Sequence, residues 1–122
     1  MNEGKQKKLL IIDDNKSITD MLSQYLTMKN FSCVISNNGR NALNLIMKEK
    51  YDIILLDLSM PEFTGLDVIE SLEKDGMMKD LNIIVFTASS INNEEIQNLL
   101  KRGIKACIKK PVQLAELIKM IS

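Results

Sequence analysis

A run of large aliphatic residues that ends in a carboxylate constrains the fold of this chain more than any other feature. Residues 51–61, Tyr-Asp-Ile-Ile-Leu-Leu-Asp-Leu-Ser-Met-Pro, contain four consecutive Ile and Leu residues, then Asp57, then a turn marked by Pro61. An unbroken run of this kind is typical of a strand buried on both faces in the middle of a parallel sheet. Open α/β sheets bind ligands outside the carboxyl ends of their strands, so Asp57 is a candidate site residue.

Other apolar runs alternate with amphipathic stretches along the whole chain. The predicted strands are 9–12, 31–35, 53–57, 82–87 and 106–109. This alternation predicts an α/β fold in which a five-stranded, doubly wound parallel sheet carries five helices on its two faces. We therefore expect one domain over residues 1–122, with a flexible N-terminal tail at residues 1–6.

Short motifs predict where three of the helices begin. Ser17-x-x-Asp20, Thr64-x-x-Asp67 and Asn92-x-x-Glu95 have the spacing of a helix-capping box. Behind each motif, apolar residues recur at helical spacing, and we expect them to face the core. The predicted core residues are Ile18, Met21, Leu22, Tyr25 and Leu26; Leu66, Ile69 and Leu72; and Ile96, Leu99 and Leu100.

The composition excludes several classes of function. Hydrophobic residues make up 45% and charged residues 26% of the sequence, as in an ordinary globular protein. Sixteen basic and sixteen acidic residues cancel, so no charge excess indicates nucleic acid or a membrane as a direct partner. The chain has no histidine and therefore no histidine-based triad or metal ligand. No apolar run reaches the length of about 20 residues that a membrane span needs, and the polar start does not resemble a secretory signal.

The two cysteines, Cys33 and Cys107, are far apart in the sequence and lack the spacing of a redox or metal motif. If the strand order is 2-1-3-4-5, they fall on the two edge strands, about 19 Å apart. A disulfide requires Cα atoms within about 7 Å of each other. We therefore expect reduced thiols in a cytoplasmic protein.

Four of the predicted strands end on residues that can take part in chemistry. These residues are Asp13 with Asp14, Asp57, Thr87 and Lys110. Each of them alone is compatible with a turn or a solvated surface. In a doubly wound sheet of order 2-1-3-4-5, however, the strands that they follow are consecutive neighbours about 4.8 Å apart, and their carboxyl ends share one edge. This order predicts that the side chains converge in one pocket.

The chemistry of that pocket follows from its charges. Three carboxylates in one place repel one another, which disfavours their ionised forms. A divalent cation relieves the repulsion, and carboxylate oxygens with water are a ligand set that suits Mg²⁺. Lys110 adds a positive charge on the other side and Thr87 a neutral hydrogen-bond donor. Together these groups predict a site for a phosphoryl group that Asp57 attacks in line.

In combination, these motifs are specific enough to suggest a family. From Lys7 to Ile121 the chain resembles the receiver domain of two-component response regulators, which has the flavodoxin-like (CheY-like) fold. The matching motifs are Ile-Ile-Asp13-Asp14, Leu-Leu-Asp57-Leu-Ser-Met-Pro61 with Gly65, Phe-Thr87-Ala88 and Lys110-Pro111. The resemblance implies a phosphorelay acceptor that takes its phosphoryl group from a histidine kinase or a histidine phosphotransfer protein. Such a domain signals to a downstream protein target, unknown here, and is not an enzyme, although it assists its own phosphorylation and autodephosphorylation.

The resemblance also implies which residues bind the metal and accept the phosphoryl group. Asp57 is expected to be the phosphoacceptor and a metal ligand. Asp14 is expected to bind Mg²⁺ directly and Asp13 largely through water. The backbone carbonyl of Ser59 is expected to complete the protein ligands.

Other residues are expected, from the same resemblance, to bind the phosphoryl oxygens. These are Thr87 and the backbone N–H groups of Ala88 and Ser59. Lys110 is expected to pair with Asp57 before the transfer and with the phosphoryl group after it, and the Lys110-Pro111 bond is expected to be cis. Phosphorylation would then shift a conformational equilibrium that is read on the face formed by the fourth helix, fifth strand and fifth helix.

The chain departs from the family pattern at one position. Most relatives carry Tyr or Phe three residues before the motif lysine, coupled to the threonine by a rotamer change, whereas this chain has Cys107. A thiol cannot fill and vacate the pocket of an aromatic ring, so the usual output coupling is not implied. Ser59 and Ser89 stand at the positions that tune phosphoryl lifetime in the family, and their small size predicts moderate to fast autodephosphorylation.

Two other kinds of protein place similar residues on a similar sheet. An aspartate-nucleophile phosphatase of the haloacid-dehalogenase type needs a second aspartate two residues after the nucleophile, where this chain has Ser59. A flavin-binding module needs a phosphate loop after the first strand, where Asp13 and Asp14 would repel a phosphate without a metal. Within the favoured family, a stand-alone phosphorelay intermediate and a receiver excised from a larger regulator or hybrid kinase both remain open.

Overall fold

The computed structural model describes residues 6–88 and 90–122, and every predicted strand and helix is present in it. The strands are β1 (Lys8–Ile12), β2 (Ser32–Ser36), β3 (Ile53–Asp57), β4 (Ile83–Thr87) and β5 (Ala106–Lys109). The helices are α1 (Lys16–Met28), α2 (Gly39–Lys48), α3 (Gly65–Lys74), α4 (Asn93–Lys101) and α5 (Leu114–Ile121). A short 3-10 helix, η1 (Met78–Asp80), precedes β4 and was not predicted.

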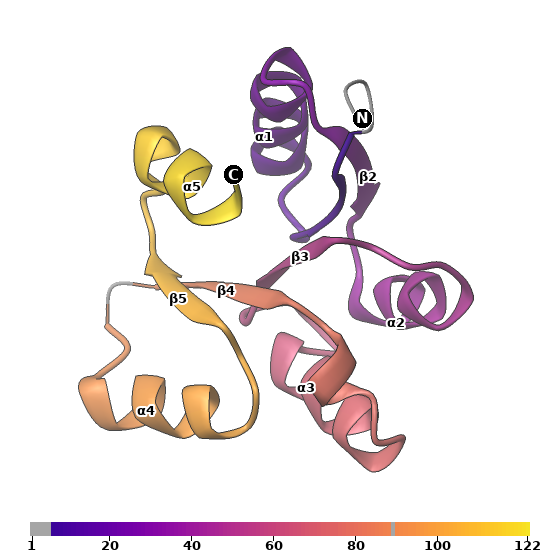
Figure 1. Ribbon diagram of the computed structural model, residues 1–122. Helices are drawn as coiled ribbons and strands as arrows, with labels where there is room; N and C mark the ends of the chain where they lie inside the picture. Colours follow the sequence, from indigo (N-terminus) through magenta and orange to yellow (C-terminus); the bar gives the residue numbers. More distant parts are fainter. Residues whose placement is uncertain (1–5, 89) are drawn as a thin grey trace.

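The five strands form one parallel sheet in the order β2-β1-β3-β4-β5, as predicted (Figure 1). β3 lies in the middle, with Ile12 of β1 beside Leu56 and Phe86 of β4 beside Asp57. All five residues of β3 are buried. The carboxyl ends of β1, β3, β4 and β5 therefore follow one another along a single edge of the sheet.

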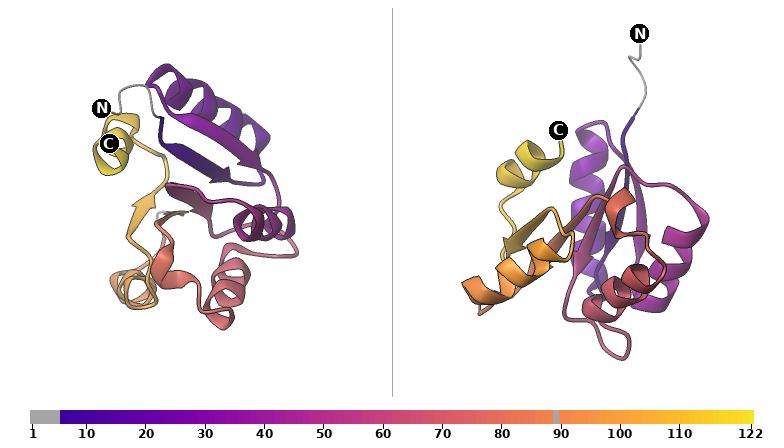
Figure 2. Two further views of the ribbon diagram at one scale, coloured as in Figure 1. Left: turned by 45° about the vertical axis from the view of Figure 1, so that its right-hand side comes forward. Right: turned by 60° about the horizontal axis from the view of Figure 1, so that its bottom comes forward.

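Helices cover both faces of the sheet, α1 and α5 on one face and α2, α3 and α4 on the other (Figures 1 and 2). Successive strand residues point to opposite faces. Leu55 accordingly packs with Leu22 of α1 and Leu117 of α5, whereas its neighbour Leu56 packs with Val68 of α3. A central strand such as β3 contributes side chains to the apolar layers on both faces of the sheet. An unbroken run of Ile and Leu is therefore the sequence that β3 requires.

Two of the three predicted helix caps are correct. Thr64 with Asp67 and Asn92 with Glu95 form reciprocal capping boxes at the starts of α3 and α4. The prediction at Ser17 is wrong, because α1 begins at Lys16 and its cap is Asn15, whose side-chain oxygen accepts from the Ile18 N–H at 3.2 Å. Asn is as good a cap as Ser, and starting the helix earlier brings it directly after the acidic pair.

The predicted helix stripes are correct at their centres and wrong at their margins. Leu66 is 45% exposed, and Val68 is buried in its place. Met21 and Leu100 are also exposed, at 44% and 37%. A helix packed against a sheet buries only one stripe of its surface, so apolar residues at the margin of that stripe remain in solvent.

The remaining predictions about the chain concern its tail, its cysteines and membranes. Residues 1–5 of the predicted tail lie outside the described residues, and the side-chain amide of Gln6 donates to Asn30 at 3.1 Å. Cys33 and Cys107 are free and lie on β2 and β5, the two edge strands, as predicted. None of the helices in residues 6–88 and 90–122 has the length and apolar character that crossing a membrane would take.

Candidate functional site

The acidic residues that follow β1 and end β3 meet at the carboxyl edge of the sheet. Carboxylate oxygens of Asp13, Asp14 and Asp57 lie within 4.8 Å of one another. Asp13 is 1% exposed and Asp57 is 2% exposed, whereas Asp14 faces solvent. The parallel sheet brings these residues together across 44 positions of sequence because β1 and β3 are neighbours in register.

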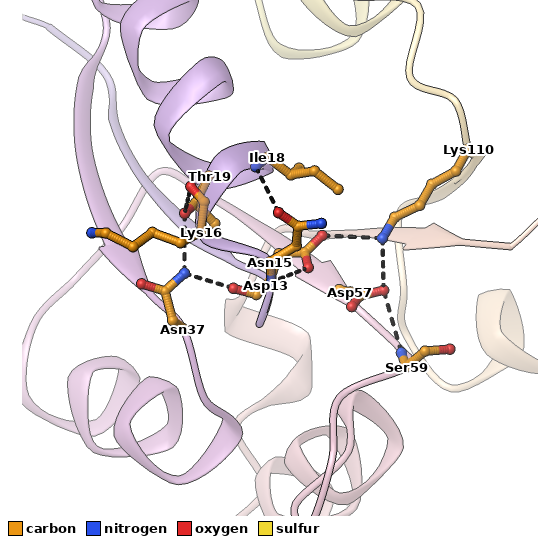
Figure 3. Close-up of polar contacts among 9 residues, drawn as sticks. All are labelled: Asp13, Asn15, Lys16, Ile18, Thr19, Asn37, Asp57, Ser59 and Lys110. Carbon is orange, nitrogen blue, oxygen red and sulfur yellow. Dashed lines mark hydrogen bonds and ion pairs between the residues drawn. The ribbon is translucent and has the colours of Figure 1, made fainter.

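Lys110, after β5, closes the cluster from the other side (Figure 3). Its Nζ atom donates to Asp13 Oδ2 at 3.0 Å and to Asp57 Oδ1 at 3.3 Å. The backbone of the same residue is held by β4, because the Lys110 N–H donates to the Thr87 carbonyl at 2.8 Å. The Lys110-Pro111 peptide bond that follows is cis, as expected. The Lys110 ammonium group thus bonds to two of the three carboxylates, and the cluster keeps an excess of negative charge.

The loop after β3 is pressed against the carboxyl end of that strand. The Ser59 N–H donates to Asp57 Oδ1 at 3.3 Å, and the Gly65 N–H donates to the Leu58 carbonyl at 3.1 Å. A Cβ atom at Gly65 would lie only 2.4 Å from the Asp57 carbonyl oxygen and 2.7 Å from the Leu58 Cα. This close approach is why the position needs glycine.

The charges of the cluster change the proton affinities of its members. Burial, and then the neighbouring charge of Asp13, raises the pKa of Asp57, and the bonds from Ser59 and Lys110 only partly offset this. For Lys110, partial burial opposes the charged form, but the hydrogen bond to Asp13 and the charges of Asp57 and Asp13 outweigh it and raise the pKa. Lys110 therefore stays protonated, and even so the ionised form of Asp57 remains unfavourable. An additional positive charge at this position would stabilise the ionised carboxylates.

A divalent cation would supply this charge, and the residues present fit one. Three carboxylates offer only oxygen ligands, which hard cations such as Mg²⁺ prefer. Asp13 already uses both oxygens within the protein, on Lys110 and on the Asn15 N–H at 2.9 Å. The exposed Asp14 is therefore the carboxylate with the freest access to a cation and its water shell.

The other predicted site residues lie at the same edge but take less part in its hydrogen bonds. Thr87 ends β4 and is 5% exposed, and Ala88 and Ser59 are exposed beside it and beside Asp57. Among residues 6–88 and 90–122, the bonds of the cluster run through Lys110, the carboxylates and the Ser59 N–H rather than through the Thr87 hydroxyl. Ser89 lies outside the described residues.

Cys107 occupies β5 as predicted. It is half-buried and packs against the apolar layer that faces α3 and α4. Burial raises the pKa of its thiol, so the thiol stays neutral at physiological pH.

An apolar groove of about 570 Å³ opens beside Lys110. Its lining joins the first turns of α1 to the start of the loop before α5: Ile18, Met21, Ala88, Lys110, Pro111 and Val112. The exposed Met21, which the sequence placed in the core, is part of this lining. A surface that approaches Asp57 from this side would meet apolar groups first.

One polar contact next to the cluster was not predicted from the sequence. The side-chain amide of Asn37, after β2, donates to the Asp13 carbonyl at 2.8 Å and to the Thr19 hydroxyl at 3.0 Å (Figure 3). In the sequence, Asn37-Asn38-Gly39 resembles an ordinary turn. Its partners are 24 and 18 residues away, and no local pattern encodes contacts of that length.

A parallel sheet of order β2-β1-β3-β4-β5 with helices on both faces has the CheY-like fold, and in this chain the buried aspartate, the acidic pair and the lysine lie at the carboxyl edge of that sheet. The model of the response regulator receiver domain family matches residues 9–122, and the chain belongs to that family.

Individual relatives support this assignment. The chain is 33% identical over 112 residues to the phosphate regulon transcriptional regulatory protein PhoB of Pseudomonas aeruginosa, matching 92% of this chain but only 48% of PhoB. It is 27% identical over 115 residues to the polar-differentiation response regulator DivK of Brucella anthropi, matching 94% of this chain and 93% of DivK. The chain thus spans about half the length of some curated relatives and nearly the whole of another.

Among solved structures, the response regulator TrrA of Thermotoga maritima, in complex with Mg²⁺-BeF, is 27% identical in sequence with a TM-score of 0.77. The match covers 96% of this chain and 100% of TrrA. A relative of the same fold has therefore been observed with a magnesium ion.

Proposed function

We propose that this chain is the phosphoacceptor domain of a two-component phosphorelay, with Asp57 as the acceptor. The observation that carries the proposal is the position of Asp57, a buried carboxylate that shares a 4.8 Å cluster with two others and bonds to Lys110. In the transfer, an Asp57 oxygen forms a bond to phosphorus while the phosphorus–nitrogen bond of a phosphohistidine donor breaks. The donor imidazole leaves with the electron pair of that bond.

The transfer would depend on Mg²⁺. Asp14, Asp13 and Asp57, together with the backbone carbonyl of Ser59, would hold the ion. When bound, it would neutralise charge on the phosphoryl oxygens. The cluster contains three carboxylates and one ammonium group, and this excess of negative charge supports the binding of a divalent cation.

The chain's own residues would do the remaining work by position. Lys110 already bridges Asp13 and Asp57, and it needs only to follow the new charge as it develops on the phosphoryl group. The Ser59 N–H, which now donates to Asp57, would turn to a phosphoryl oxygen together with the Ala88 N–H and the Thr87 hydroxyl. Burial of Asp57 excludes bulk water from the nucleophile until a donor arrives.

The donor would be a histidine kinase or a histidine phosphotransfer protein, and it would dock on the groove beside Lys110. An apolar lining at the entrance to the site favours a protein donor that contributes an apolar surface. Met21→Glu should therefore slow transfer from a phosphohistidine protein while leaving acetyl phosphate, which needs no docking surface, unaffected.

We further propose that phosphorylation is reported on the face of α4, β5 and α5 and reversed by autodephosphorylation. Cys107 lies on β5 within this face, so its small side chain would replace the aromatic rotamer change of relatives by a smaller repacking. The chain matches nearly all of DivK but only about half of PhoB, so both a stand-alone relay protein and a receiver within a longer regulator are compatible with it. In either case the signal to the downstream target would begin at this face.

The decisive experiment is Mg²⁺-dependent labelling with acetyl phosphate, followed by intact mass, on the wild-type chain and Asp57→Asn. The wild type should gain one phosphoryl group only when Mg²⁺ is present, and Asp57→Asn should gain none. Equal labelling of the two proteins would show that Asp57 is not the acceptor.

A further inference from the structure

The loop that carries Asp13 and Asp14 is attached at both backbone groups of Asp13, to the last residue of β2 and to the first residue of the loop after it. The Asp13 N–H donates to the Ser36 carbonyl at 3.2 Å. The Asp13 carbonyl accepts from Asn37 Nδ2 at 2.8 Å. Asp13 thus cannot move without breaking bonds to residues that are not part of the acidic cluster.

Asn37 also connects this loop to the first turn of α1. Its Nδ2 atom donates a second bond, at 3.0 Å, to the hydroxyl of Thr19, which is completely buried. That hydroxyl donates in turn to the Lys16 carbonyl at 3.1 Å, so its hydrogen is committed and its lone pair is free to accept from Asn37. Both hydrogens of the Asn37 amide are therefore used, one on the segment between β1 and α1 and the other on the first turn of α1 (Figure 3).

This attachment opposes a force that is present whenever the metal is absent. Asp13, Asp14 and Asp57 carry like charges within 4.8 Å, and Lys110 neutralises only part of them. Repulsion would drive the acidic loop away from β3 unless its backbone were fixed. Holding ligands at binding distance in advance removes the cost of assembling them around the ion.

We propose that Asn37 is a positioning residue for the metal site: it fixes the loop of Asp13 and Asp14 through its backbone, without touching the ion itself. This inference rests on the proposed Mg²⁺-dependent function and adds a determinant from outside the family's motifs. Residues that orient ligands in this way typically contribute about 10-fold to 100-fold to metal affinity.

The chain supplies a matched control in Asn41. Its side-chain amide also donates a bond, to the Ser36 hydroxyl at 3.0 Å, and it lies only four residues further along the chain. This bond goes to β2 and not to the segment between β1 and α1. Asn41→Ala therefore removes the same type of group from the same region without releasing the acidic loop.

The test uses Mg²⁺ alone as the probe. Its dissociation constant is measured by NMR titration, and thermal unfolding is followed with and without saturating Mg²⁺, for the wild type, Asn37→Ala and Asn41→Ala. Asn37→Ala should weaken Mg²⁺ binding by about 10-fold and lose much of the Mg²⁺-dependent rise in Tm, because stabilisation by a ligand follows its affinity. Asn41→Ala should bind Mg²⁺ like the wild type.

A second pair of variants covers the case in which Asn37→Ala does not fold. Thr19→Val keeps the shape of the buried side chain but removes the acceptor for Asn37, whereas Thr19→Ser keeps the acceptor. Weaker Mg²⁺ binding in Thr19→Val, restored in Thr19→Ser, supports the proposal.

Two results would overturn it. Mg²⁺ affinities of Asn37→Ala and Thr19→Val within twofold of the wild type would show that the loop needs no anchor. An equal fall in Tm with and without Mg²⁺ would show that Asn37 stabilises only the fold. In both cases a wild type that binds Mg²⁺ and is labelled on Asp57 leaves the proposed function intact. A wild type that shows neither property would overturn the proposed function together with this inference.

Discussion

The two ends of β3 carry the same residue type in opposite circumstances. Asp52, just before the strand, is exposed and accepts from the backbone N–H of Lys8 at 2.6 Å. Asp57, at the end of the strand, is 2% exposed and shares its lysine with another buried carboxylate. At the first end the charge is open to solvent and bonds to one backbone group, whereas at the second two buried carboxylates share one ammonium group.

The surroundings of each end account for the difference. Lys8 pairs with Glu49 and lies over the Tyr51 ring, 5.0 Å from its centroid, but the two charged side chains are 35% and 48% exposed. Exposed ion pairs of this kind contribute little to stability. At the carboxyl end, the polar groups that follow four of the strands are largely shielded from solvent by helices and loops. An unbalanced charge there therefore changes stability more than an exposed one does. The difference shows where the molecule tolerates an unfavourable arrangement, which is where a cation and a phosphoryl group would relieve it.

The largest effect should come from replacing Lys110 at the carboxyl end of β3 with alanine, and Lys8 at the amino end provides the comparison. Lys110→Ala is expected to lower the rate of acetyl phosphate labelling by about 100-fold, the usual loss when a preorganised donor to developing charge is removed. Lys8→Ala removes the ammonium group at the other end and should leave the rate unchanged. Initial rates of labelling at saturating Mg²⁺ measure both, and similar rates for the two variants would mean that the ends of β3 are functionally equivalent.

Two glycines test how tightly the carboxyl end is packed. A Cβ at Gly65 would lie 2.4 Å from the Asp57 carbonyl oxygen, and one at Gly39 would lie 2.3 Å from the Phe63 carbonyl oxygen. Gly65→Ala and Gly39→Ala should each lower the free energy of unfolding by about 1 to 3 kcal/mol, the usual cost of overpacking. Urea denaturation measures that loss. Only Gly65→Ala should also slow labelling, and an unchanged rate would show that the Asp57 backbone tolerates displacement.

Replacement of Asp57 and of Asp52 by asparagine should affect the free energy of unfolding differently. Burial and the charge of Asp13 raise the pKa of Asp57, so ionised Asp57 opposes folding once the pH exceeds the ordinary value of 3.8. Asp57→Asn should therefore raise the free energy of unfolding at neutral pH, without divalent cations, by about 1 kcal/mol, the scale of one repulsive charge contact. The gain should vanish as the pH falls toward 3.8. Asp52→Asn, whose amide oxygen still accepts from Lys8, should give no gain in the same urea titrations.

The smallest effect is expected at the amino end. The Tyr51 hydroxyl is buried and, within the described part of the chain, has no hydrogen-bond partner. Tyr51→Phe removes this group and should raise the free energy of unfolding by up to about 1 kcal/mol. Burial, then the charge of Glu49, raises the Tyr51 pKa above 10.0, so the wild type should lose stability as the pH rises past 10.0 and Tyr51→Phe should lose less. Parallel pH curves for the two proteins would contradict this.

Strong local patterns made most of the fold predictable. The Ile and Leu run before Asp57 is long enough, and flanked clearly enough, to be a central strand, and the reciprocal caps at Thr64 and Asn92 are local contacts. Where two local solutions compete, prediction failed: Asn15 rather than Ser17 caps α1, because both residues accept bonds equally well. Leu66 and Met21 were placed in the core because periodicity alone does not tell how wide a stripe a neighbour covers.

The candidate site divides in the same way. Asp13, Asp57 and Lys110 were predicted to meet because the direction of a parallel strand decides on which edge its last residue lies, and the structure brings them together. The Asn37 amide and its bonds to Asp13 and Thr19 were not predicted, since an Asn in a turn has no distinguishing neighbours in sequence.

By itself, the sequence determined the strands, their common direction and the chemical groups at their ends, because hydrophobic periodicity and turn residues act over a few positions. Only the tertiary structure decided how those groups are balanced. The sharing of one ammonium group between Asp13 and Asp57, the exposure of Asp14 and the attachment of the acidic loop by Asn37 depend on distances between segments far apart in the chain. Burial and repulsion exist only once those segments are packed, and they turn a set of polar strand ends into a site.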